Sequence, residues 1–337
     1  MIISRNKKIK ITFLLAIFII LAGIYIWRGI YLPINKNSRE IIFSIKKGEG
    51  TKEISINLEE EGMIRMATLF RIYSIFKGVS GRLQAGEYLV SPSMTIPEIA
   101  EKFVSGDVIE DQIIIIEGWN LRDIGEYLEK KGFKQDDFLE LTKKDFSGDY
   151  DFLKDKPKDL NLEGYIFPDT YKFKKGENLE EIINKTLQNL DKKLTLEIRE
   201  EIDRRGKTIF EIITMASLIE REVQTLEDKK IVSGILWKRS ENNVPLQVDA
   251  TISYITGKKG IDISIEETKI DSPYNTYKYR GLPLGPICNP GIESIIAATY
   301  PESSAFWYYL STPDGKTIFS RTLEEHNIAK AKYLKNN

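Results

Sequence analysis

The chain has 337 residues, more than one average domain, so we expect one membrane segment and two further units. With 49 Lys and Arg against 50 Asp and Glu it lacks a basic excess, and without nucleic-acid-binding motifs we expect no nucleic acid partner. A single cysteine, Cys288, and a single histidine, His326, exclude an intramolecular disulfide and Cys/His zinc sites, which leaves catalysis to carboxylates.

Residues 11–28 are the first predicted element, a membrane-spanning helix. This segment is uncharged up to Trp27, at the short end of the roughly 17–25 residues that span a bilayer. Four basic residues precede it: Arg5, Lys7, Lys8 and Lys10. The positive-inside rule then places the tail 1–10 in the cytoplasm and the rest of the chain outside the inner (cytoplasmic) membrane. A cleaved signal peptide is the alternative, but no small-x-small exit follows the apolar run. Residues 29–39 indicate a polar linker.

A strand–turn–helix pattern then occurs three times. The predicted strands are Ile41–Ile45, Tyr88–Val90 and Ile113–Ile116. The residues expected to cap the helices that follow are Thr51, Thr95 and Asn120. Such units are common and can recur by chance. They also resemble LysM-like modules, which pack two helices on a small sheet and can bind N-acetylglucosamine-containing glycans. On this resemblance we expect a LysM-like module over residues 40–108.

The second half of the chain is predicted to be mainly helical. Residues 162–173 contain Pro168 and cannot be one regular helix. Helices are expected at about 178–204, 208–224, 227–240 and 292–299, and a hairpin from 305–311 and 316–320 around Pro313-Asp314-Gly315. Residues 271–291, with four prolines and three glycines, predict a long structured loop, and such loops are usually functional. A bracing crossover beneath the next helix is the alternative for that loop.

Glu220 is the first candidate for chemistry. On a helical wheel with Ala216 at 0°, Glu220 falls at about 40°, inside the apolar stripe, whereas Glu222 falls at about 240°. Burial disfavours a charged carboxylate, so a glutamate on a packed face tends to keep its proton, as a general acid must. A solvent-exposed glutamate at the helix end is the alternative.

Six segments, in this order, carry a family resemblance: EGWNLRDIGEYL, LEGYIFPDTY, MASLIEREV, LQVDATISYITG, SPYNTYKYRGLPLGPICNPG and EEHN. Together they resemble the MltG (YceG-like) family of endolytic murein transglycosylases over about residues 40–332. In that family the catalytic glutamate is the first one of a segment resembling A-S-I-V-E-K-E, which implies Glu220, with Arg221 where lysine is usual. The implied reaction breaks the MurNAc–GlcNAc bond and leaves a 1,6-anhydro-MurNAc end. The glutamate acts first as acid and then as base, and no metal or organic cofactor is implied.

The same resemblance implies a substrate-binding set: Glu163, Gln247, Asp249, Asn275, Tyr277 and Asn327. For each of these, a turn, capping or packing role is the alternative. The implied partners are nascent peptidoglycan glycan strands and penicillin-binding synthases, and the implied role is to terminate glycan elongation.

We therefore expect an α+β protein with a membrane helix, a LysM-like module at 40–108 and a mixed α+β catalytic domain at 109–337. Two other functions remain open. One is a non-catalytic glycan-binding or scaffold protein. The other is a muramidase or glucosaminidase, which would need a second carboxylate such as Glu163 or Asp249.

Overall fold

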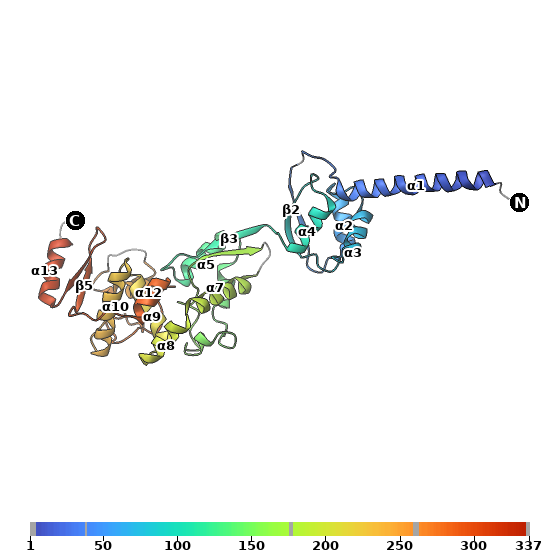
Figure 1. The fold of residues 1–337 in the computed structure, drawn as a ribbon. Coiled ribbons are helices and arrows are strands. Elements are labelled where there is room, and N and C mark those ends of the chain that lie inside the picture. Colours follow the sequence, from blue (N-terminus) through green and yellow to red (C-terminus); the bar gives the residue numbers. More distant parts are fainter. Residues whose placement is uncertain (1–4, 38, 175–177, 259–262, 335–337) are drawn as a thin grey trace. The chain divides into compact units, whose positions relative to one another are not determined.

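The computed structural model describes residues 5–37, 39–174, 178–258 and 263–334, and confirms the mixed α+β class (Figure 1). The chain divides into two compact units. Unit 1 contains the residues up to Asp111 and a short segment that begins at Lys172, and unit 2 contains Gln112–Tyr171 and the chain from Asn178 onward. The expected boundary at 108 lies three residues before this division. Residues 1–4 of the expected tail and Ser38 of the expected linker lie outside the described residues.

Helix α1 (Arg5–Tyr31) contains a 21-residue segment, Ile11–Tyr31, that is long and apolar enough to cross a membrane. The helix continues past the expected end at residue 28, so the first residues of the expected linker are helical. The reason is packing, because Ile30 is only 8% exposed and belongs to the core of unit 1. Arg65 holds the chain after the helix by donating hydrogen bonds to the carbonyl of Leu32, at 2.9 Å, and to that of Pro33, at 2.8 Å.

The rest of unit 1 is built from two strands and three helices: β1 (Ile41–Ile45), α2 (Thr51–Glu60), α3 (Ala67–Phe76), β2 (Gly86–Val90) and α4 (Ile96–Ser105). The antiparallel pairing of β1 with β2 sets Phe43 opposite Tyr88, and both side chains are buried. Helices α2 and α3, which pack on each other, come between the two strands in sequence. The sequence identified the strands as short extended apolar runs, and in the fold Phe43 and Ile45 of β1 are buried while Ser44 between them is exposed.

The predicted helix caps are correct at two of the three sites. The Thr95 hydroxyl accepts a hydrogen bond from the backbone N–H of Glu98, and the Asn120 side chain accepts from Arg122 and Asp123. Thr51 is instead the first helical residue of α2, with Gly50 at the N-cap. The Thr51 hydroxyl donates to the carbonyl of Ser80 at 2.6 Å, so it ties the helix start to another loop.

Unit 2 contains most of the remaining helices. They are α5 (Leu121–Lys130), α6 (Gln135–Leu141), α7 (Leu179–Lys193), α8 (Leu196–Arg204), α9 (Ile209–Glu220), α10 (Leu226–Glu241), α11 (Asp249–Thr256), α12 (Ile292–Thr299) and α13 (Leu323–Tyr333). Two short 3₁₀ helices are Asp151–Leu153 and Glu267–Lys269. Strand β3 (Glu110–Ile114) pairs with β4 (Thr170–Lys174), and the residues of both strands are divided between the two units. Strands β5 (Tyr308–Ser311) and β6 (Thr317–Ser320) form the antiparallel hairpin that the sequence predicts.

Two of the predicted helices differ from the structure, one because it is interrupted and one because it ends early. The stretch 178–204 is not one helix, because α7 stops before Leu194 and α8 starts after Thr195, whose hydroxyl accepts from the N–H of Ile198. Similarly, the stretch 208–224 is helical only from Ile209 to Glu220, and Arg221 is the C-cap of α9.

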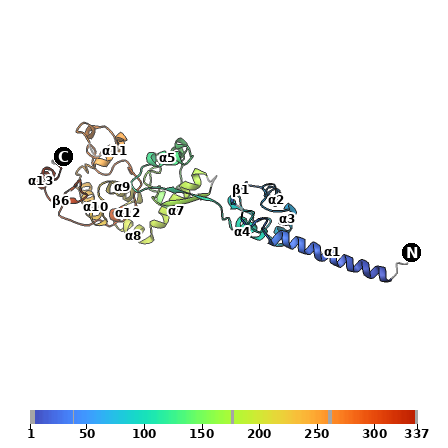
Figure 2. The same cartoon turned by 90° about the horizontal axis from the view of Figure 1, so that it is seen from above.

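Helix α9 is the central element of unit 2. It packs against α8, α10 and α12, and both views of the ribbon place these helices around it (Figures 1 and 2). All eight residues from Ile212 to Ile219 are 0% exposed, so the helix is enclosed on every side rather than along one stripe. The loop 271–291 forms only turns and bends before α12, as its prolines and glycines predict.

Candidate active site

A cavity of about 520 Å³ lies at the C-terminal end of α9 in unit 2, and we call it the Glu222 pocket. Its walls come from the residues after α9 and from α10, α11, β5, α13 and the loop 271–291. Its polar and aromatic lining includes Arg221, Glu222, Arg239, Gln247, Asp249, Tyr277, Tyr308, Tyr309, His326 and Asn327. Four of the six predicted substrate-binding residues (Gln247, Asp249, Tyr277 and Asn327) therefore line one pocket.

Glu222 enters this pocket because the chain leaves the helix at Arg221. Burial raises the pKa of Glu222 to about 7, and the negative charge of Asp249 also raises it. Hydrogen bonds from the Tyr309 hydroxyl and the backbone N–H of Ala250 work in the opposite direction. A carboxyl group with a pKa near 7 can give and take a proton at neutral pH, as an acid–base catalyst must.

Asp249 and Gln247 stand at the start of α11. Gln247 has a positive φ of 56°, a conformation uncommon for a residue other than glycine, which turns the chain into the helix. Its side-chain oxygen accepts a hydrogen bond from Nη2 of Arg239 at 2.6 Å. The Tyr277 hydroxyl donates to Oδ1 of Asp249, and burial raises the pKa of Tyr277, which keeps this donor protonated. The pocket therefore presents fixed donors and acceptors next to Glu222.

Helix α13 closes the pocket with His326 and Asn327. The His326 ring stacks on Tyr308 with a centroid distance of 5.3 Å. Burial lowers the pKa of His326, as do the charges of Lys330 and Arg239, so the ring is neutral at pH 7. This environment fits a packing role for His326.

Glu220 has different surroundings, although it is only two residues from Glu222. Its Oε2 accepts hydrogen bonds from the backbone N–H of Gly291, at 3.0 Å, and from the Ser294 hydroxyl, at 2.6 Å. Its Oε1 lies 3.5 Å from Nζ of Lys229, whose side chain is 4% exposed. The Glu220 carboxylate thus joins the end of α9 to α10 and to the start of α12, the arrangement of a buried structural ion pair. It does not line the Glu222 pocket.

Glu163, also in the predicted set, is 5% exposed and lies apart from the Glu222 pocket. Its carboxylate accepts from the backbone N–H of Leu121 at 3.1 Å, from the Asn289 amide at 3.2 Å and from the Tyr254 hydroxyl at 3.4 Å. Burial raises the pKa of Glu163 to about 8, against the effect of the Leu121 and Tyr254 donors. The side chain ties the start of α5 to the loop before α12 and to α11.

Asn275 does not face a ligand-sized space. It is 0% exposed, and its amide nitrogen donates to the carbonyls of Thr268, at 3.0 Å, and Ile270, at 2.7 Å. Its side-chain oxygen accepts from the backbone N–H of Tyr277 at 2.9 Å and of Lys278 at 3.3 Å. The expectation that Asn275 contacts a sugar is therefore not supported by its geometry. The side chain braces the loop 271–291, which is the alternative left open above.

The sequence analysis did not place Glu222 in a pocket, because it extended the helix to residue 224. On a continuing helix Glu222 points away from the stripe, but α9 stops at Glu220 and the wheel no longer applies. The available signal was the segment Glu220-Arg221-Glu222 itself, with two carboxylates at the end of an apolar run.

Comparisons with known proteins identify the family of the chain. The profile of the YceG-like family matches residues 43–332. A Bacillus subtilis protein named endolytic murein transglycosylase is 32% identical, over 94% of this chain and 91% of its own. A Streptococcus pneumoniae protein of the same name is 30% identical, over 98% of this chain and 66% of its own. The crystal structure of a YceG-like protein from Listeria monocytogenes, 32% identical, matches with a TM-score of 0.59 over 87% of this chain and all of its own.

Proposed function

The chain belongs to the YceG-like family, and from this membership and the Glu222 pocket we propose that it is an endolytic lytic transglycosylase of peptidoglycan. Its relatives in Bacillus subtilis and Streptococcus pneumoniae are named for this activity. The observation that carries the proposal is the position of the Glu222 carboxyl group in a pocket of fixed polar and aromatic side chains, where burial also raises its pKa.

We propose Glu222 as the catalytic acid and base on the geometry of its pocket, and Glu220, the residue that the family resemblance implies, is the alternative that two substitutions separate below. Protonated Glu222 donates its proton to the oxygen between N-acetylmuramic acid and N-acetylglucosamine, and the bond from that oxygen to the muramoyl C1 breaks. The Glu222 carboxylate then removes the proton from the muramoyl C6 hydroxyl. The C6 oxygen bonds to C1, which closes the 1,6-anhydro ring and consumes no water. One group can serve both steps because the second step restores its proton.

The other pocket residues are assigned supporting roles in this proposal. Gln247, Asp249, Tyr277 and Asn327 would hold sugar hydroxyl and acetamido groups, and the Asp249 carboxylate would stabilise positive charge that develops at C1. Glu163 and Asn275 would act at a distance, by holding the loops that carry the pocket walls.

Two matched substitutions test the assignment of the catalytic glutamate. Glu222→Gln should keep the fold and lower turnover of purified glycan strands by about a thousandfold or more, since it removes the transferable proton. Glu220→Gln should lower thermal stability through the loss of its pairing with Lys229, while activity per folded molecule stays within about tenfold of wild type. Activity that survives in folded Glu222→Gln and is lost in folded Glu220→Gln would return the role to Glu220.

A hydrolase remains the second candidate, because Asp249 supplies a second carboxylate in the same pocket. The lytic and the hydrolytic reaction leave different chemical groups at the ends of the cleaved glycan strands. Mass spectrometry of digested strands should find 1,6-anhydro ends from a lytic transglycosylase and reducing ends from a muramidase or glucosaminidase. A chain that gives no products but retains glycan affinity would instead be a binding protein.

The remaining parts of the proposal concern the place of the reaction. The order β1–α2–α3–β2 and the packing of α2 on α3 support a LysM-like role for unit 1. Helix α1 would anchor the chain in the inner membrane with its N-terminus in the cytoplasm, so that both units act outside the membrane. There the enzyme would cut nascent strands near penicillin-binding synthases and terminate their elongation.

A further inference from the structure

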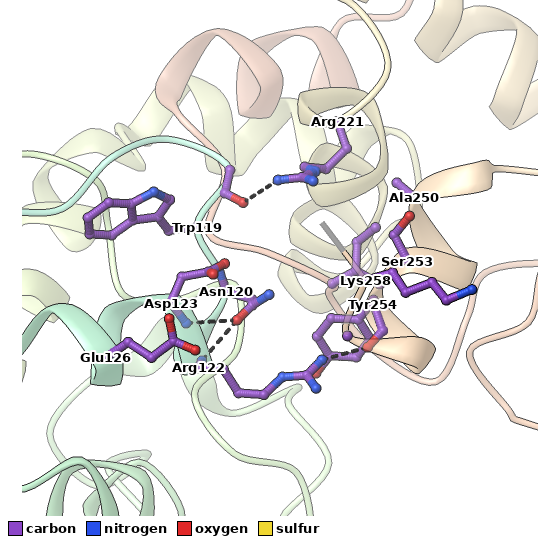
Figure 3. Close-up of a pocket in the computed structure, with 13 residues that line it drawn as sticks. Trp119, Asn120, Arg122, Asp123, Glu126, Arg221, Ala250, Ser253, Tyr254 and Lys258 are labelled. Carbon is purple, nitrogen blue, oxygen red and sulfur yellow. Dashed lines mark hydrogen bonds between the residues drawn. The ribbon is translucent and has the colours of Figure 1, made fainter. Parts of the chain in front are cut away.

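The hollow drawn in Figure 3 belongs with the candidate active site of unit 2, because Arg221, Ala250 and Ser253 line both this hollow and the Glu222 pocket. Unit 1 has a different feature, which neither the fold nor the proposed reaction uses. This feature is the exposed face of helix α3.

Helix α3 is apolar on two opposite faces. One face, with Leu69 and Phe70, is buried in the core of unit 1. On the other face Ile72, Ile75 and Phe76 are 49%, 68% and 86% exposed. A helix that is apolar all round is typical of a protein core or of a membrane environment. The exposed face therefore indicates an apolar neighbour that unit 1 does not itself supply.

The start of α3 lies directly against the last turns of α1. The Tyr25 hydroxyl donates to Sδ of Met66 at 3.5 Å, and a Cβ added to Gly29 would lie 2.3 Å from Cδ1 of Leu69. In both views α3 lies on the side of unit 1 from which α1 extends, and α4 lies farther from that side (Figures 1 and 2). Because Ile30 belongs to the core of unit 1, α1 leads into this unit without a free linker.

These contacts set the start of α3 at the level of the membrane surface. The segment Ile11–Tyr31 has 21 residues. At 1.5 Å per residue it is about as long as the roughly 30 Å hydrocarbon core is thick. Tyr25 lies about 9 Å, and Gly29 about 3 Å, before the end of that segment. Trp27 and Tyr31 are exposed at the same end, and tryptophan and tyrosine concentrate where the headgroups begin.

The charges of this part of unit 1 favour an anionic surface. The chain as a whole is balanced, with 49 basic and 50 acidic residues, but no acidic residue occurs between positions 65 and 82. Glu59 of α2 is engaged at the start of α3, where it accepts from the N–H of Ala67 at 2.7 Å. Basic residues beside an apolar helix face are typical of helices that lie in the interface of anionic bilayers. The basic residues of the segment, all exposed, are Arg65, Arg71, Lys77 and Arg82.

We propose that α3 is an interfacial helix, whose exposed face, with Ile72, Ile75 and Phe76, lies in the anionic phospholipid headgroup layer beside α1. Unit 1 then lies on the membrane surface and is not held above it by a flexible tether. This inference rests on α1 crossing the membrane. It does not depend on which glutamate is catalytic or on how the glycan is cut.

The first test measures the depth of α3 in a bilayer. The full-length chain is inserted, one copy per disc, into nanodiscs of mixed phosphatidylcholine and phosphatidylglycerol, and a nitroxide is attached to Ile75→Cys. The native Cys288 is buried, and wild-type protein treated with the same reagent controls for its labelling. Ser105→Cys is the matched site, because Ser105 is exposed at the end of α4.

Oxygen dissolves in lipid and a charged nickel chelate stays in water, so the ratio of their effects on the nitroxide reports its depth. This ratio should be about fivefold higher at Ile75 than at Ser105, since the α3 label enters the boundary between headgroups and lipid tails. Equal ratios at the two sites would overturn the proposal.

The second test changes the charge beside the same label. Arg71→Gln combined with Lys77→Gln should lower the ratio at Ile75 to its value in phosphatidylcholine alone, because the attraction to anionic headgroups is lost. Lys46→Gln combined with Lys47→Gln removes the same charge from the turn after β1 and should leave the ratio unchanged. Equal effects of the two pairs would overturn the role of the anionic lipid.

The same samples separate the lipid from other occupants of this face. Dipolar broadening of the Ile75 label in discs that hold two copies, with a water-exposed label in discs that hold one, would show a contact between copies and overturn the proposal. A chain that does not elute with the discs would overturn it through its premise, that α1 crosses the membrane. The proposed reaction is judged separately, by the ends of the digested glycan strands.

Discussion

At the residue scale, the proton on Glu222 sets the pH range in which the proposed reaction can begin. Only the protonated form can act as the acid, and burial raises the pKa of Glu222 to about 7. The reaction returns the proton to the same group, so the free enzyme needs no second, deprotonated group. We therefore predict that kcat/KM on purified strands is level at low pH and falls as the pH rises through about 7. A pH series from 5 to 9 measures this.

The control for this profile is Glu220→Gln, which should keep the same falling limb because Glu220 lies outside the pocket. A wild-type profile that stays level to pH 9, or a limb that disappears in Glu220→Gln, would contradict the role of Glu222.

Glu163 predicts a pH dependence of stability rather than of activity. Its pKa is raised from 4.5 to about 8 in the folded chain, because the carboxyl group is buried. Between these values the folded state holds a proton that the unfolded state has lost, so the free energy of unfolding should fall as the pH rises from about 4.5 to about 8. The glutamine side chain in Glu163→Gln does not titrate, so the free energy of unfolding of this variant should depend less on pH over that range. Urea unfolding of both proteins at pH 5 and pH 8 measures this difference. An equal change in the free energy of unfolding between the two pH values in both proteins would contradict the raised pKa of Glu163.

At the element scale, the sequence predicted those elements whose boundaries are marked by local chemistry. Strand β1 and helix α12 have the expected limits, and α5 starts at its Asn120 cap, since alternation, capping and breaker residues act within a few positions. The end of α9 was not predicted, because Arg221 is a good helix former and only the packing around the helix sets where it stops. That one boundary also decided which glutamate enters the pocket.

The loop 271–291 shows the same limit of local reasoning. Its proline and glycine content predicts irregular backbone, but the side-chain directions depend on residues that precede it. Asn275 turns inward because the carbonyls of Thr268 and Ile270 lie within reach of its amide. Gln247, Asp249, Tyr277 and Asn327 could be grouped through the family resemblance, whereas their distances from Glu222 follow from the tertiary fold.

Asn275 therefore gives a prediction about stability. Asn275→Ala leaves two carbonyls and two N–H groups of the loop without their side-chain partner, which should lower the free energy of unfolding by about 2–4 kcal/mol. Activity per folded molecule should stay near that of wild type. Asn275→Asp keeps the acceptor for Tyr277 and Lys278 but sets a carboxyl oxygen against the carbonyls of Thr268 and Ile270, so it should not restore the stability. A normal melting temperature with a tenfold loss of turnover would place Asn275 at the substrate instead.

At the scale of the whole molecule, α1 belongs to unit 1 as well as being long enough to cross a membrane. Cleavage near residue 30, as for a signal peptide, would cut the chain within the segment that unit 1 uses. Such a cut would either make Ile30 the first residue of the mature chain or remove it, although its side chain is part of the core. We therefore predict that the mature protein keeps residues 1–31 and is extracted from membranes only by detergent.

The physical reason can be tested with two soluble chains, one beginning at Arg28 and the other at Arg39. The first keeps Ile30 in the core and keeps the carbonyls of Leu32 and Pro33 that bind Arg65, and the second loses all of them. Loss of one buried apolar side chain and two hydrogen bonds should lower the free energy of unfolding of unit 1 by about 2–5 kcal/mol. Hydrogen exchange of the α3 amides reports on that unit. Equal protection in the two chains, or a mature N-terminus near residue 30 in cells, would show that unit 1 does not depend on α1 and that the helix can serve as a removable signal.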